Sequence, residues 1–256
     1  MARNFTTTTD RVEYPSDAAL NITGNLSIYC WIYLNAGSVY HSLVSKTNND
    51  AGGSANPYDF RTNNEAVPTL SCTRGGTSYD LTDSTGTIST GAWHHVAVTH
   101  DGATGTPAVV MYIDGIDATA TLTFDDRTDA VSTNTQPLYI GERGDELGGD
   151  CRIACVGIHN VILTAGEIKT AMRRGWTPRG LVFFSLVGHD ADLSGSARTP
   201  TVSGTSIVDG PPIGPPFGFD LGWMGAFTAA GAVAGHPAMR RWGGVPHLAS
   251  HYGGWN

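Results

Sequence analysis

The stretch GAWHHVAVTHDG, residues 91–102, is rich in histidine, a side chain that binds metals and transfers protons near neutral pH. Its residues alternate as in a β-strand, so Trp93 and His95 fall on one face and His94 and His100 on the other. The two adjacent histidines therefore point apart. Neither His-x-x-x-His spacing on a helix nor a Cys-x-x-Cys pair accompanies them. We predict structural strand histidines, and a metal site that joins one of them to a distant partner stays open.

The elements around this stretch are predicted to be mostly strands. A Gly-rich break and the run VVMYIDG, residues 109–115, follow it and predict a hairpin closed by an Asp-Gly turn. Strand-like runs separated by Gly, Asn, Asp and Pro recur as far as residue 160. One helix is expected, with Thr164 and Glu167 at capping-box spacing and Gly175 as its stop. This pattern predicts an all-β sandwich or jelly roll with one short helix.

Composition narrows the class of protein. Hydrophobic residues make up 40% of the 256, which is enough to fill a core, and only 15% of the residues are charged. The net charge is −8, with a pI near 5.5 and no basic stripe, so we expect no nucleic-acid partner. The weakly charged surface, rich in Thr, Ser, Gly and Asn, is typical of a subunit in an assembled shell or fibre.

The four cysteines are expected to be free thiols. In a strand, Cys151 and Cys155 lie about 13 Å apart, beyond the reach of about 7 Å of a disulfide. Cys30 is in phase with hydrophobic neighbours, and it resembles a small buried apolar residue. The amino terminus has no apolar secretory segment, so we expect synthesis in the cytoplasm.

The order of several motifs resembles a known family. NLSIYCWIYL, LVSK, GAWHHVAVTHDG, VMYIDG, PLYIGE and IACVGIHNVILTAGEI occur as in the laminin G-like and pentraxin-like branch of the concanavalin A-like sandwiches. The resemblance covers about residues 5–175 and implies two antiparallel sheets in a jelly roll. After the helix, LVFFSLVGHDADLSG and the Pro-rich stretch that follows it resemble a tail found on laminin G-like proteins of bacteriophage and environmental sequences, which implies a virion protein.

The same resemblance raises two possible functions, glycoside cleavage and calcium binding. Glucanases with this sandwich carry carboxylates at alternate positions of one strand, and that pattern is absent here, so no enzyme is expected. Pentraxin-like proteins bind calcium with acids from two loops, which are the hard oxygen ligands that calcium prefers. The matching candidates are Asn48, Asn49, Asp50, Glu142, Asp145 and Glu146, although solvated turn acids are the alternative. Calcium is therefore the one cofactor considered.

Aromatic residues offer a further binding hypothesis, because a flat ring stacks on a pyranose face. The candidates for such a sugar platform are Trp31, Tyr33, Tyr40, Tyr58 and Tyr79. Packing within a sheet is the alternative for each.

The composition of the carboxyl-terminal residues predicts an extended arm that joins subunits in an assembly. We expect a jelly-roll core at 1–178, a closing strand and Gly/Ser/Pro-rich connection at 179–210, and an extended arm at 211–256. Glycines and Pro237 dilute the apolar run of the arm, so no membrane span is predicted. Its large apolar side chains are expected to contact a neighbouring subunit: Phe217, Phe219, Trp223, Met224, Phe227, Trp242, Tyr252 and Trp255.

Two functions follow from these expectations. The first is a non-catalytic structural subunit of a virion, a capsid decoration or tail-fibre protein whose partners are its own copies and other virion proteins. The second is a calcium-dependent lectin-like module that binds surface glycans.

Overall fold

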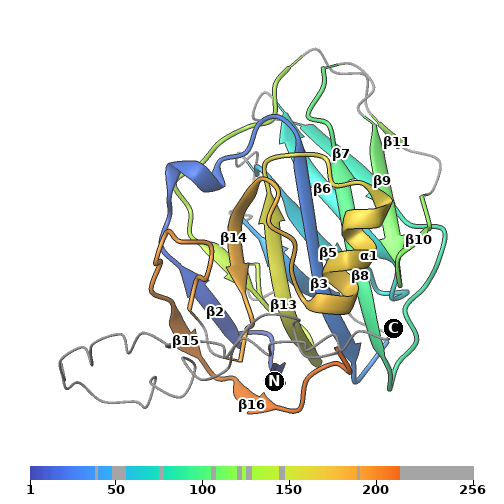
Figure 1. Cartoon of the computed structure of the whole chain (residues 1–256), viewed down its shortest axis with the longest axis vertical. Coiled ribbons are helices and arrows are strands. Elements are labelled where there is room, and N and C mark those ends of the chain that lie inside the picture. Colours follow the sequence, from blue (N-terminus) through green and yellow to red (C-terminus); the bar gives the residue numbers. More distant parts are fainter. Residues whose placement is uncertain are drawn as a thin grey trace, which may run out of the picture. The chain divides into compact units, whose positions relative to one another are not determined.

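A computed structural model describes residues 1–37, 40–47, 56–74, 78–104, 108–119, 123–124, 129–143, 148–188 and 191–213. The chain divides into two units, Met1–Phe217 and Gly218–Asn256, and every element below belongs to the first. Two antiparallel sheets form two layers in this unit (Figure 1). The predicted all-β sandwich with one short α-helix is confirmed.

The first sheet has the strand order β10-β9-β8-β3-β13-β1-β16, and β14 pairs with the far end of β13. The predicted histidine strand and its hairpin partner are adjacent strands here, β8 and β9. The bounds are β1 Ala2–Phe5, β3 Leu26–Leu34, β8 Trp93–His100, β9 Val109–Ile113, β10 Ile116–Asp117, β13 Cys151–His159, β14 Leu181–Ser185 and β16 Ser206–Val208.

The second sheet has the order β11-β7-β6-β5-β4-β12-β2-β15. Its bounds are β2 Arg11–Tyr14, β4 His41–Ser45, β5 Asp59–Thr62, β6 Pro68–Arg74, β7 Ser78–Asp83, β11 Thr123–Phe124, β12 Leu138–Ile140 and β15 Thr201–Ser203. A short 3-10 helix, Ala18–Leu20, follows β2.

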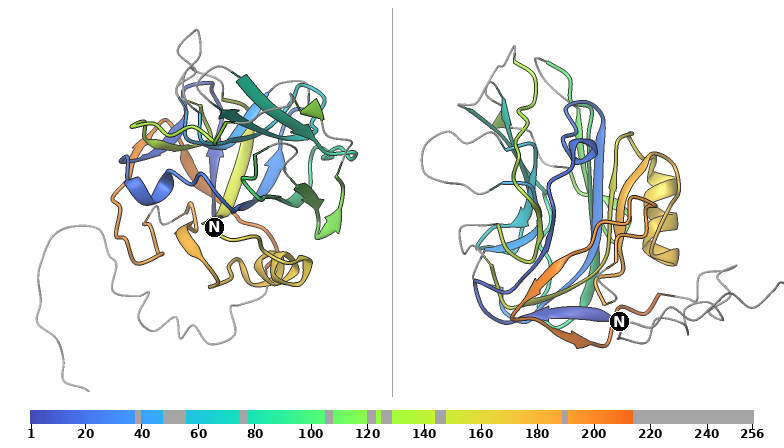
Figure 2. Two further views of the ribbon diagram at one scale, coloured as in Figure 1. Left: turned by 90° about the horizontal axis from the view of Figure 1, so that it is seen from above. Right: turned by 90° about the vertical axis from the view of Figure 1, so that its left-hand side faces the viewer.

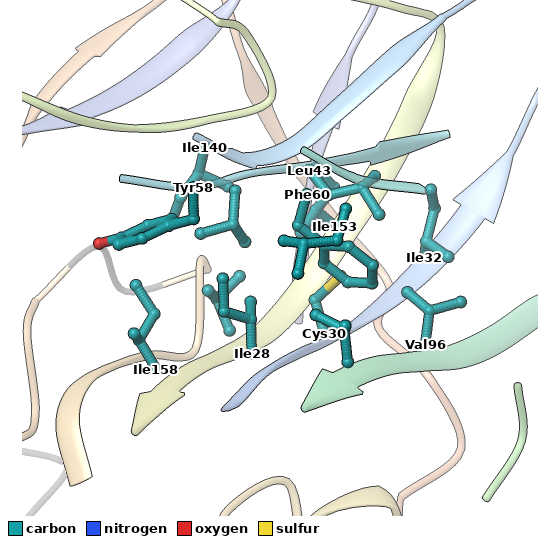
Figure 3. Close-up of a cluster of buried hydrophobic side chains, with 14 of the residues drawn as sticks. Ile28, Cys30, Ile32, Leu43, Tyr58, Phe60, Val96, Ile140, Ile153 and Ile158 are labelled. Atoms are coloured by element: carbon teal, nitrogen blue, oxygen red, sulfur yellow. The ribbon is translucent and has the colours of Figure 1, made fainter. Parts of the chain in front are cut away.

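The hydrophobic core lies between the sheets because side chains alternate along each strand. In β3, Ile28, Cys30 and Ile32 point inward and are completely buried. Tyr58 and Phe60 of the second sheet meet them from the opposite side (Figure 3). All four cysteines are buried and free, as expected from the sequence.

The outer face of the first sheet is covered by the helix α1, Ala165–Arg174 (Figure 2). The predicted capping box is present, and Gly175 ends the helix in the left-handed conformation that glycine favours. Ile168 and Ala171 of the helix pack on Tyr29 and Ala97 of the sheet. The second sheet faces away from this helix, and its outer surface is polar.

The segment at 179–210, expected as a closing strand and connection, contributes β14, β15 and β16. β16 pairs with β1 at the edge of the first sheet, and β15 pairs with β2 at the edge of the second. Arg198 secures the intervening chain, because it donates to Asp192 at 2.6 Å and to Asp17 at 2.9 Å.

Within the described residues, no helix has both the length and the hydropathy needed to cross a membrane.

Candidate functional site

A row of polar side chains crosses the outer face of the second sheet. Residues that lie opposite each other in neighbouring strands point to the same face, and the register places five of them in one line. From β2 to β6 the line runs Glu13, Tyr139, Ser45, Asp59 and Ser71. Hydroxyl and carboxylate groups dominate it, and all of its members except Glu13 are buried.

Asp59 of β5 is a buried member of the row, only 2% exposed. Its Oδ2 accepts a hydrogen bond from Arg61, two residues along β5 and therefore on the same face. Arg143, which follows β12, approaches the same oxygen to 3.6 Å. Two arginines thus lie against one carboxylate oxygen.

A second charge cluster lies at the β2 end of this face. Arg11 Nε is 3.3 Å from Glu13, and Arg11 Nη1 is 3.3 Å from Glu142. The guanidinium also lies 5.9 Å from the ring centroid of Tyr139, a cation–π distance. Arg11 is about one-third exposed, so this end of the face is accessible to solvent.

Several buried polar atoms on this face have no hydrogen-bond partner. They are Oδ1 of Asp59, Nε of Arg61, Oγ of Ser42 and Ser45, and Oγ1 of Thr73. Buried polar groups are paired in the great majority of cases, because an unpaired group costs about 1–3 kcal/mol. One carboxylate oxygen, one charged donor and three hydroxyl groups on this face therefore have unused hydrogen-bonding capacity.

The calcium residues predicted from sequence are not assembled by the described structure. Asn48, Asn49, Asp50, Asp145 and Glu146 lie outside the described residues. Glu142 is described, and its buried carboxylate pairs with Arg11. Within the described part of the chain, no group of three or more His, Cys, Asp or Glu side chains is placed to hold a metal ion.

The structure does not bring the described aromatic candidates together on one face. Trp31 lies on the outer face of the first sheet, where its Nε1 donates to the carbonyl oxygen of Met172 in α1. Tyr58 is completely buried in the core, on the opposite sheet. Tyr33 lies between Trp93 and Arg152, and Tyr40 is 40% exposed elsewhere. The side chain of Tyr79 lies outside the described residues.

The histidines of the opening stretch separate as their alternation predicted. His95 is completely buried and lies opposite Trp31, whereas His94 lies opposite Ile32. Nδ1 of His100 accepts a hydrogen bond from the backbone of Gly102 at 3.2 Å. The arm residues from Phe217 to Trp255 lie outside the described residues, so their role in subunit contact stays a prediction.

Comparison with known proteins agrees with this sandwich. The model of the concanavalin A-like lectin/glucanases superfamily, of the laminin G type, matches residues 6–169, more than half of the chain. The chain belongs to this superfamily. The match lies within the range of the motifs that carried the resemblance. No curated protein matches the sequence.

Two solved structures share the superfamily sandwich. A proposed carbohydrate binding protein from Bacteroides ovatus has a TM-score of 0.60 and 17% identity over 84% of this chain. The match spans only 62% of that longer protein. The heptameric SAP-like pentraxin from Limulus polyphemus has a TM-score of 0.53 and 14% identity, over 80% of this chain and 93% of its own. At these identities the likeness establishes the fold.

Proposed function

We propose that the protein is a carbohydrate-binding module whose binding face is the outer surface of the second sheet, centred on Asp59. The supporting observation is the set of unpartnered buried atoms on Asp59, Ser45 and Arg61. Each sugar hydroxyl both donates and accepts, so adjacent hydroxyls of one ring would pair with the carboxylate and with the donors beside it. Membership of a superfamily of lectins and glucanases supports the same ligand class.

Access to the centre of this face runs past two arginines. The side chains of Arg61 and Arg143 are each 15% exposed, whereas that of Asp59 is 3% exposed. A ligand would therefore meet the guanidinium groups first and reach the carboxylate beside them. Arginine suits this position, because its planar fork presents several donors in fixed directions.

This face is proposed to bind sugar without cleaving it. Glycosidases of the common type need one protonated carboxyl group as acid and a second carboxylate as base or nucleophile. Here Glu13, Asp59 and Glu142 each form an ion pair with an arginine. All three carboxylates are thus engaged by guanidinium groups, which supports a role in holding a ligand in place.

A glycan array followed by calorimetry with the strongest glycan tests the proposal. Ser45→Ala removes a hydroxyl that has no partner in the free protein, so the fold should tolerate it. Losing one hydrogen bond to a sugar should weaken binding about five- to tenfold. Asp59→Asn should weaken it at least as much, because its hydrogen bonds are charge-assisted.

Thr62→Val supplies the matched control. Oγ1 of Thr62 is also buried and unpartnered, but Thr62 lies one position from Arg61 in β5 and so points to the core face. This variant should bind as the wild type does. Binding that survives both Ser45→Ala and Asp59→Asn would place the site elsewhere, and an array without specific binding would refute the function itself.

A further inference from the structure

Three side chains outside the proposed sugar face form a connected relay. Oγ of Ser89 lies 2.8 Å from Nε2 of His94, and Nδ1 of His94 lies 2.8 Å from Oδ2 of Asp114. The order of atoms is that of a serine hydrolase triad, in which the carboxylate holds one ring nitrogen and the hydroxyl faces the other. Such triads recur on unrelated folds and are recognised by this geometry.

The carboxylate is fixed by the turn between β9 and β10. Asp114 has a φ of 52° and Gly115 one of 73°, the left-handed pair of a tight hairpin. The N–H of Asp114 donates to the carbonyl oxygen of His95 at 2.8 Å, and the N–H of His95 donates to Oδ1 of Asp114 at 2.9 Å. One carboxylate oxygen is thus held by the backbone, and the other is directed at His94.

The serine is held between two backbone anchors. Just before it, the N–H of Ile88 donates to the carbonyl oxygen of Ala66 at 2.9 Å. Just after it, the N–H of Gly91 donates to the carbonyl oxygen of Leu34 at 2.9 Å. The loop is therefore fixed on both sides of Ser89, whose own side chain is exposed.

All three members of the relay reach solvent. Ser89 is exposed, and the side chains of His94 and Asp114 are 18% and 43% exposed. The residues that follow Ser89 are Thr90 and Gly91, which are small and polar. The hydroxyl of Ser89 can therefore be reached from solvent.

We propose that Ser89 is an activated nucleophile that takes the acyl group of short-chain carboxylic esters, with His94 as base and Asp114 as positioning residue. As Oγ bonds to the carbonyl carbon, its proton passes to Nε2 of His94. The bond from that carbon to the ester oxygen then breaks, and the proton leaves with the alcohol. Water attacks the acyl-serine in the same way, which releases the carboxylic acid and restores the hydroxyl. This activity goes beyond the proposed binding of sugars and does not depend on it.

The test follows acyl transfer from p-nitrophenyl acetate with the full chain. We expect release of nitrophenol together with an acetyl adduct on the peptide that contains Ser89. Ser89→Ala should abolish the adduct at this peptide. Ser206→Ala is the matched control, because Ser206 is an exposed serine of β16, and it should leave both signals unchanged.

The variant Asp114→Asn tests whether the carboxylate positions His94, without disrupting the turn that contains it. Asparagine tolerates the left-handed backbone of this turn, so the hairpin should persist. The rate of acylation should nevertheless fall at least about tenfold, because the carboxylate no longer holds the imidazole in the required tautomer. If this variant unfolds, His94→Asn, which leaves the turn intact, should give the same loss.

Two results would overturn the proposal. One is acetylation of Ser89 no faster than that of exposed Ser206. The other is ester hydrolysis by Ser89→Ala at the wild-type rate, which would show that the hydroxyl only fastens the loop. Neither result bears on sugar binding, which the variants of Ser45 and Asp59 test separately.

Discussion

The ring of Tyr29 lies 5.6 Å from the ring of His95, centroid to centroid, beneath α1 on the outer face of the first sheet. His159 lies against Tyr29 at a further 5.5 Å. Both histidines are completely buried, and burial lowers the pKa of His95 to about 3 and that of His159 to about 4. The covered face therefore holds two neutral imidazoles.

Because of these two buried histidines, the folded protein should lose stability in mild acid. The pKa of histidine in the unfolded chain is about 6.5, so below this pH the unfolded state binds protons that the folded state excludes. The free energy of unfolding should be fully retained above about pH 6.5 and should fall towards pH 4 and below. His95→Phe should reduce the fall between about pH 6.5 and 5, a range in which ordinary carboxylates stay ionised. Urea unfolding across this range is the measurement, and an identical fall in both proteins would contradict the prediction.

Replacement of the buried Arg198 should destabilise the protein much more than replacement of a surface arginine. Its side chain is 4% exposed, and that of its partner Asp192 is completely buried. Arg198→Ala leaves this carboxylate buried without its cation and should cost about 3–5 kcal/mol of stability. Arg179→Ala breaks a solvent-exposed pair with Glu167 and should cost far less, because water screens the charges of exposed pairs. Chemical unfolding of both variants compares them, and equal losses would show that Arg198 does not clamp the carboxyl-terminal segment.

Calcium binding stays a prediction of the sequence. If Asn48, Asn49, Asp50, Asp145 and Glu146 hold the ion, calcium should raise the melting temperature with increasing concentration, because it would bind only the folded state. Glu142 should contribute little, since it pairs with Arg11. The measurement is a calcium titration after removal of metal with a chelator. The absence of any shift at millimolar calcium would exclude the site.

The arm, residues 211–256, is expected to be needed for assembly but not for folding of the sandwich. Deletion of residues 217–256 removes no described strand or helix, so the sandwich should keep its melting temperature and remain soluble. The loss of Phe217, Trp223, Trp242 and the other large apolar residues should abolish self-association. Light scattering of the full and truncated chains provides the comparison. An unchanged oligomer would rule out an assembly role for the arm.

The sequence predicted the elements whose signals are local. The helix α1 carries both its capping box and its terminal glycine, and β8 alternates over its whole length. β1, β15 and β16 were not predicted, because these short runs lack the apolar or aromatic residues flanked by turn signals that mark the equally short β2, β5 and β12. They become strands because the edges of the two sheets supply hydrogen-bond partners.

The candidate sites were less predictable, because they depend on register. Asp59 and Arg61 can be placed on one face of a strand from sequence, but Ser45 joins them only through the pairing of β4 with β5. Likewise, His94 and Asp114 belong to motifs that are visible in the sequence, whereas nothing near Ser89 indicates that it meets His94. Long-range pairing supplies what local spacing does not show.

The pairing of β15 and β16 with the edges of both sheets sets the time at which this domain can fold during synthesis. β1 and β2 leave the ribosome first, but their neighbours β12 and β13 follow more than a hundred residues later, and β15 and β16 later still. The earliest strands must therefore remain unpaired until almost the whole sandwich has been made. Contacts between such distant residues slow folding and expose strand edges to other chains. A nascent chain that stops near residue 178 would lack these edge strands and would leave β1 and β2 exposed as edges that can pair with other chains.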